Sequence, residues 1–128
     1  MLGSVLFAIA LVQSGPKATV ERLYAADEAS ADALLAPELR AWAAGCPGWI
    51  DRVRPGAPGA VTVNELNRSG RDQSVVLARY AANGETYYRR FTLSLRDGDW
   101  LIDDAVAATG QPTLRDHLAD CASGGGGA

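Results

Sequence analysis

Two dipeptides, Asn83-Gly84 and Asp97-Gly98, constrain the fold of this chain more than any other feature. Each stands between two segments in which apolar and polar residues alternate, a pattern typical of strands. Such dipeptides favour type I′ hairpin turns, because these turns require positive φ at both central residues. A further turn-rich stretch, residues 67–72, separates the first alternating segment from the second. The four segments, residues 60–66, 73–82, 85–96 and 99–107, therefore predict a four-stranded antiparallel meander.

Helical spacing of apolar residues dominates the chain before this meander. The predicted helical pieces are residues 16–26, residues 31–35 with Ser30 as N-cap, and a piece that begins at Pro37 and stops at Gly45. Residues 45–59 hold three prolines and four glycines, so we expect an ordered loop or lid there rather than a helix or a central strand.

A last helix is predicted after the strands. Thr113 and Asp116 have the spacing of a capping box, and Leu114, His117, Leu118 and Cys121 fall on one face of the helix that follows. Helices, then a meander, then a closing helix predict an α+β fold in which the helices pack on one face of a curved four-stranded sheet.

Length and charge exclude several classes of protein. The chain has 128 residues, enough for one domain. Twelve basic and fifteen acidic side chains leave a net charge of −3, which argues against a nucleic-acid binder with a basic face. One histidine and two cysteines are too few for a zinc finger or a multi-ligand metal cluster, so we expect no metal and no cofactor.

The first 14 residues have the character of a signal peptide. They carry no charged side chain, and Val5 to Val12 form an apolar run that is too short to span a membrane but suits the centre of a secretory signal. Ala8 and Ala10 provide an A-x-A pattern for cleavage. The alternative is a helix that docks on the core. With cleavage, we expect a periplasmic or secreted bacterial protein with no stable membrane span, a single domain over residues 15–122, and a flexible Gly-rich tail over residues 123–128.

Cys46 and Cys121 are an even pair separated by 75 positions. In an exported protein such a pair predicts a disulfide, and closing so long a loop stabilises a fold by about 4 kcal/mol in the chain-entropy model. The alternative is two reduced cysteines packed as small hydrophobic residues.

Three segments resemble a known superfamily: residues 20–24 (VERLY), 97–104 (DGDWLIDD) and 113–118 (TLRDHL). Over residues 17–122 the chain resembles small secreted bacterial domains of the nuclear transport factor 2-like superfamily. The resemblance implies a half-cone with a cavity between the curved sheet and the helices. Relatives include ketosteroid-isomerase-like enzymes, transport adaptors and domains without known activity. The loop at residues 45–59 departs from the superfamily, which usually has a helix or short strands there.

Such a cavity would be lined by aromatic side chains and one acid. An isomerase-like reaction needs a carboxylate and a tyrosine donor, for which Asp104, Tyr24 and Tyr87 are the candidates, with Tyr80 as a further donor. Strand alternation places Asp104 on the covered face with Trp100 and Ile102. Alternatively, Asp104 is structural and bonds a loop or an arginine. Trp49, in the Pro/Gly loop, either anchors that loop or closes over a ligand.

Other polar residues have structural as well as functional interpretations. We expect His117 to pack on the last helix and reach a backbone carbonyl. Four loop arginines could form an anion-attracting rim, or could simply be solvated: Arg52, Arg54, Arg68 and Arg71. Tyr88, Arg90 and Thr92 lie on the face of the third strand opposite its core residues, where they could contact a partner.

Two functional hypotheses follow. The first is an exported non-catalytic binding module, which holds a small apolar ligand in the cone cavity (lined by Trp49, Tyr24, Trp100 and Asp104) or a partner protein on the sheet. The alternative is a ketosteroid-isomerase-like isomerase or cyclase. A homodimer formed through the exposed sheet face is a third arrangement.

Overall fold

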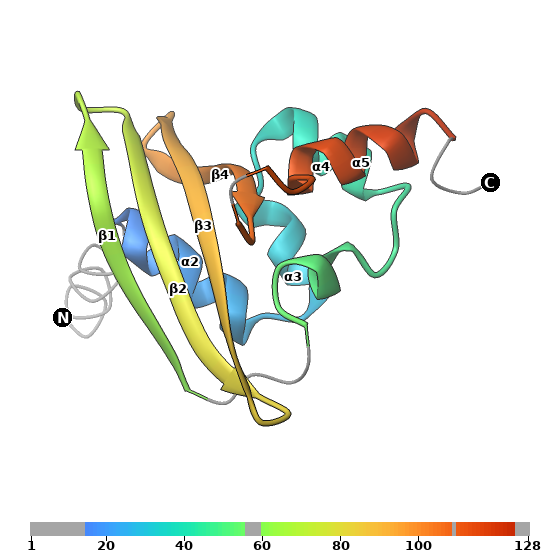
Figure 1. Ribbon diagram of the computed structural model, residues 1–128. Coiled ribbons are helices and arrows are strands. Elements are labelled where there is room, and N and C mark those ends of the chain that lie inside the picture. Colours follow the sequence, from blue (N-terminus) through green and yellow to red (C-terminus); the bar gives the residue numbers. More distant parts are fainter. Residues whose placement is uncertain (1–14, 56–59, 109, 125–128) are drawn as a thin grey trace, which may run out of the picture.

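The computed structural model describes residues 15–55, 60–108 and 110–124 of the chain (Figure 1). The expected signal peptide, residues 1–14, and most of the expected tail lie outside the described residues. Ser123 and Gly124, with which the expected tail begins, form the turn that ends the last helix: their backbone N–H groups donate to the carbonyls of Ala119 and Cys121.

The α-helices follow the predicted order, but a short 3₁₀ helix over Trp49–Arg52 lies inside residues 45–59, where we expected a loop without a helix. It forms because these four residues include neither the prolines nor the glycines of that segment. The helical elements are α2 (Pro16–Ala25), α3 (Glu28–Ala31), η1 (Asp32–Leu34), α4 (Pro37–Ala43), η2 (Trp49–Arg52) and, after the strands, α5 (Leu114–Ala122). The N-cap of the second piece was placed wrongly: Asp27 caps α3, and its carboxylate accepts the Ser30 N–H. Asp27 caps this helix because its carboxylate lies three residues before the Ser30 N–H that it accepts, and a negative charge is favoured at the N-terminus of a helix. The predicted capping box of Thr113 and Asp116 is present at the start of α5.

The four strands form one antiparallel sheet in the order β1-β2-β3-β4. Their bounds are β1 Val61–Ser69, β2 Gln73–Ala82, β3 Glu85–Arg96 and β4 Asp99–Val106. Both predicted turns have positive φ at each central residue, 54° and 78° at Asn83-Gly84 and 53° and 86° at Asp97-Gly98. The predicted four-stranded meander is therefore confirmed. It was predictable because turn chemistry and alternation act within the turns and strands themselves.

β1 runs three residues farther than alternation predicted. The pattern breaks at Leu66, where the register shifts between Glu65 and Asn67. A β-bulge takes up one extra residue and lets pairing resume beyond it. The strand therefore continues to Ser69 through what had been expected to be a turn.

The helices lie on one side of the sheet, which confirms the predicted α+β class. Figure 1 shows α2 behind β1–β3 and the other helices beyond β4. The helical layer is joined to the sheet edge by backbone bonding, since Leu35 forms a parallel bridge with Ile102 and the Ala36 N–H donates to the Ile102 carbonyl over 2.8 Å. No helix in the described ranges is long and apolar enough to cross a membrane.

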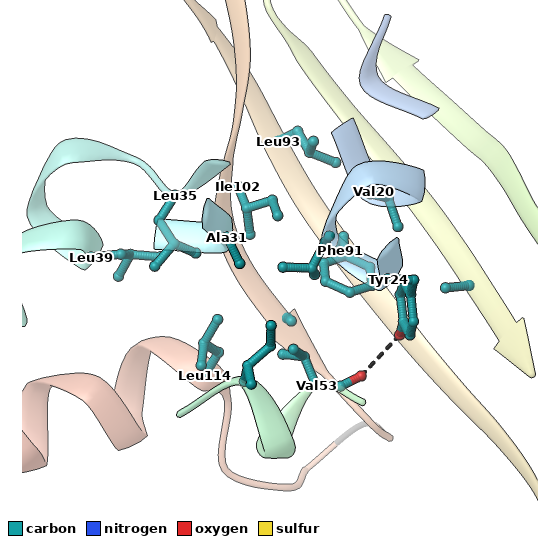
Figure 2. Close-up of a cluster of buried hydrophobic side chains, with 14 of the residues drawn as sticks. Val20, Tyr24, Ala31, Leu35, Leu39, Val53, Phe91, Leu93, Ile102 and Leu114 are labelled. Carbon is teal, nitrogen blue, oxygen red and sulfur yellow. Dashed lines mark hydrogen bonds between the residues drawn. The ribbon is translucent and has the colours of Figure 1, made fainter. Parts of the chain in front are cut away.

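The core fills the space between the two layers. Figure 2 shows Val20 and Tyr24 of α2 facing Phe91 and Leu93 of β3. Ile102 of β4 lies near Ala31 of α3 and Leu35. Phe91, Leu93 and Ile102 have no exposed surface. Each such side chain contributes about 1.5–3 kcal/mol through burial, so this layer contact dominates the stability of the fold.

The predicted disulfide between Cys46 and Cys121 is present, with the two Cα atoms 5.6 Å apart. It joins the loop after α4 to the last turn of α5. These two helices pack against each other, so the bridge closes a contact that the core already makes.

Candidate functional site

The three aromatic residues expected to line a cone cavity, Tyr24, Trp49 and Trp100, pack into the core instead. Tyr24 is 8% exposed and its hydroxyl donates to the Val53 carbonyl over 2.9 Å (Figure 2). Trp49 is 1% exposed, and its Nε1 donates to Asp32 Oδ1 over 2.8 Å. Of the two roles considered for Trp49, the structure has the anchor. None of the hollows described below is lined by Tyr24, Trp49, Trp100 or Asp104.

Three of the tyrosines, Tyr24, Tyr80 and Tyr87, form a cluster of aromatic rings. The Tyr24 ring contacts Tyr80 at 5.4 Å between centroids, and Tyr80 stacks on Tyr87 at 5.3 Å. The Tyr80 hydroxyl donates to the Pro55 carbonyl over 3.0 Å. Burial raises the pKa of both Tyr24 and Tyr80, so these hydroxyls stay protonated and hold the loop that contains Val53 and Pro55.

Asp104 lies on the opposite face from the one that alternation predicted. The register of β4 shifts so that Thr92 pairs with Asp104 while Leu93 pairs with Ile102. This bulge places Ala105, 3% exposed, in the inward position expected for Asp104. Alternation failed because one extra residue reverses the orientation of everything after it.

The Asp104 carboxylate connects the bulge to the last helix. Its Oδ1 accepts the backbone N–H of Ala105 over 2.8 Å and that of Arg115, in the first turn of α5, over 2.9 Å. These bonds correspond to the structural role considered for Asp104. No tyrosine hydroxyl is bonded to it among the described residues, so the acid–tyrosine pair that an isomerase needs is not assembled there.

The four loop arginines do not form a common rim. Arg54 donates to the Leu23 and Tyr24 carbonyls at the end of α2, and Arg68 pairs with Glu65 at 2.7 Å while its guanidinium lies 5.1 Å from the Trp100 ring. Arg71 is in the β1–β2 turn. Only Arg52 lines a hollow, of about 160 Å³, and its companion there is Arg89 rather than another of the four.

The face of the sheet turned away from the helices is the other notable surface, and we call it the open face. We define it by six outward side chains of the three strands β2, β3 and β4: Val75, Leu77, Arg79, Tyr88, Arg90 and Val106. Among the described residues, two large hydrophobic side chains are exposed: Leu66 at 52% and Tyr88 at 49%. Leu77, Tyr88, Arg90 and Val106, with Ala107 and Ala108, line a hollow of about 230 Å³.

The centre of the open face alternates apolar and cationic side chains. Leu77 pairs across the strands with Arg90, and Arg79 pairs with Tyr88 two residues along. Directly opposed side chains lie about 4.5–5.5 Å apart at Cβ, so the four form one compact group. The structure records no hydrogen bond or ion pair between either arginine and another described residue. Alternation had indicated the outward direction of Tyr88, Arg90 and Thr92; the contribution of β2 to the group requires the register of the pairing.

No family model, curated protein or solved structure matches this chain.

Proposed function

We propose that this protein is an exported, non-catalytic binding module that holds an acidic segment of a partner protein on the open face of its sheet. The observation that carries the proposal is the group formed by Leu77, Arg79, Tyr88 and Arg90, in which two apolar side chains alternate with two guanidinium groups that have no carboxylate partner in the described chain. Tyrosine and arginine are the side chains most enriched at the energetic centres of protein interfaces.

The hollow beside this group favours a side chain rather than a whole small molecule. Its volume of about 230 Å³ is below that of pockets which bury drug-sized ligands, roughly 300–1,000 Å³. Its lining includes the apolar side chains Leu77 and Val106 together with the charged Arg90. A partner with one apolar side chain flanked by carboxylates would fill the hollow and pair with both arginines.

The packed interior weighs against the other branch of the binding hypothesis, a small apolar ligand inside the cone. Tyr24, Phe91 and Trp49 occupy the space between the layers and are each less than 10% exposed. A ligand of any size would have to displace them, and creating such a cavity costs several kcal/mol.

A second copy of the chain is the other occupant considered for this surface. In a two-fold pairing of open faces, Arg79 and Arg90 of one copy would meet the same residues of the other or lie close to them. Like charges brought together at an interface cost several kcal/mol unless counter-charges intervene. An acidic partner avoids that cost, so we favour it over the homodimer.

Export enters the proposal through the cysteine pair. Disulfides form and persist in oxidising compartments, which is the environment of a periplasmic or secreted protein. The Cys46–Cys121 bridge is consistent with that environment.

The proposal is tested by NMR titration of the ¹⁵N-labelled protein with a short capped peptide that carries glutamates around a central leucine and phenylalanine. We expect amide shifts confined to β2, β3 and the end of β4, and none with the same peptide carrying lysines. Charge reversal in R79E/R90E should abolish the shifts. The matched control K17E/R71E changes the net charge equally at exposed sites away from the open face and should leave binding intact.

Three results would overturn the proposal: no shift with the glutamate peptide, equal weakening in both double variants, or shifts that map to the helices. Sedimentation of the protein alone identifies the second-copy alternative, which predicts a dimer in solution.

A further inference from the structure

The only histidine of the chain and both of its cysteines meet at one point between α4 and α5. His117 Nε2 lies 3.4 Å from Cys46 Sγ and 4.0 Å from Cys121 Sγ. The three donor atoms all lie within 4.8 Å of one another. His117 had been expected to reach a backbone carbonyl; among the residues that the structure describes, its Nε2 lies beside the two sulfurs instead.

The local structure holds these donors in place independently of the disulfide. His117 and Cys121 are four residues apart on α5, so they occupy one face of that helix on successive turns. Cys46 is 4% exposed in the loop after α4, where its N–H donates to the Ala43 carbonyl. Leu114 and Leu118, each less than 5% exposed, pack α5 on the core. Breaking the bridge therefore leaves hydrophobic contacts that keep the three donors near each other.

We propose that reduction of the Cys46–Cys121 disulfide converts this cluster into a three-residue site for a zinc-type divalent ion, with Cys46, His117 and Cys121 as ligands. Tetrahedral zinc binds sulfur at about 2.3 Å and nitrogen at about 2.0–2.1 Å, which requires donors roughly 3.5–3.8 Å apart. The two nitrogen–sulfur distances are already close to that spacing. Only the two sulfurs have to move apart, which reduction allows.

The conversion balances with a dithiol as reductant. The dithiol gives up two electrons and two protons and becomes a disulfide, while the S–S bond between Cys46 and Cys121 breaks and leaves two thiols. Zinc then displaces one proton from each thiol and binds the two thiolates and the neutral imidazole nitrogen. A water molecule would complete the tetrahedron, since three protein ligands leave one position open.

One histidine and two cysteines had argued against a metal site, because a zinc finger needs four protein ligands. Three protein ligands and a water molecule form a different kind of zinc site, in which the fourth position is open. In the oxidised protein both sulfurs are bonded to each other, so the proposed site exists in the reduced chain alone. Either state joins the same two positions, 46 and 121, and the ion would take over the link between α4 and α5. This inference does not depend on the open face.

The test uses the full chain, reduced anaerobically with a dithiol that is then removed, and zinc chloride as the probe. Competition with a chromophoric chelator measures affinity and stoichiometry, and far-UV circular dichroism before and after zinc monitors the fold. We expect one tightly bound zinc per reduced chain and none for the oxidised protein. H117Q, which keeps both cysteines and the disulfide, should weaken zinc binding at least tenfold, whereas E21Q, at an exposed position of α2, should leave it unchanged.

Cobalt supplies a second readout, because thiolate coordination in a tetrahedral field produces visible absorption that the oxidised protein and C46S/C121S should lack. The proposal is overturned if the reduced chain binds no zinc, if H117Q binds it as tightly as the wild type, or if the oxidised protein binds it equally well. It is also overturned if the reduced chain unfolds and zinc does not restore its structure.

Discussion

Replacing Asp104 with alanine should destabilise this protein although the residue belongs to no catalytic group. The substitution removes an acceptor of two backbone N–H groups, those of Ala105 at 2.8 Å and Arg115 at 2.9 Å. A hydrogen bond to a charged group contributes about 1.5–3 kcal/mol. Because the carboxylate is half-buried, we take about 1–1.5 kcal/mol for each bond, at or just below the lower end of this range, and expect D104A to lose about 2–3 kcal/mol.

In the melting temperature this loss corresponds to about 8–12 °C, since a domain of this size shifts by about 4 °C per kcal/mol. D104N keeps an acceptor oxygen without the charge and should lose about 1 kcal/mol. Urea unfolding followed by circular dichroism measures both values, and an unchanged m-value shows that the effect is on stability.

The neighbouring carboxylate is the matched control. Asp103 pairs with Arg96 over 2.9 Å at the surface, where ion pairs contribute about 0.2–1 kcal/mol. D103A should therefore cost much less than D104A. The reasoning is refuted if the two variants unfold at the same urea concentration, or if D104A stays within about 0.5 kcal/mol of the wild type.

Three further predictions concern other contacts. Y24F removes the donor to the Val53 carbonyl and should cost about 1–2 kcal/mol in urea unfolding; an unchanged midpoint would show that water replaces the hydroxyl. C46S/C121S should lose about 4 kcal/mol under oxidising conditions, and a loss below about 1 kcal/mol would contradict the chain-entropy argument. Glu38 has a pKa lowered mainly by its bond from Arg115, so its contribution is present above the ordinary value of 4.5 and disappears as the pH falls. Thermal melts of E38Q and wild type should accordingly differ at pH 7 and converge at low pH; a constant difference would refute this.

The strands show how far local patterns reach. The ends of β3 were predictable because Asn83-Gly84 and Asp97-Gly98 adopt positive φ for reasons that lie within the turns themselves. The face of Asp104 was not predictable, because a bulge depends on what the strand packs against. Ala105 fits the inward position in contact with the core, while a carboxylate in its place would lose its hydration.

The amino-acid sequence by itself predicted the order of the α-helices and strands and the antiparallel meander, and it favoured a disulfide over two reduced cysteines. These depend on turn chemistry, periodicity and the small number of thiols, all of which act over a few residues or by simple elimination. Only the tertiary structure decided which residues far apart in the chain are neighbours in space. It filled the expected cavity with Tyr24 and Trp49, assembled the open face from separate strands, and brought His117 to the disulfide. The physical reason is that burial is shared among residues far apart in the chain, so the identity of a neighbour depends on the packing of the whole domain.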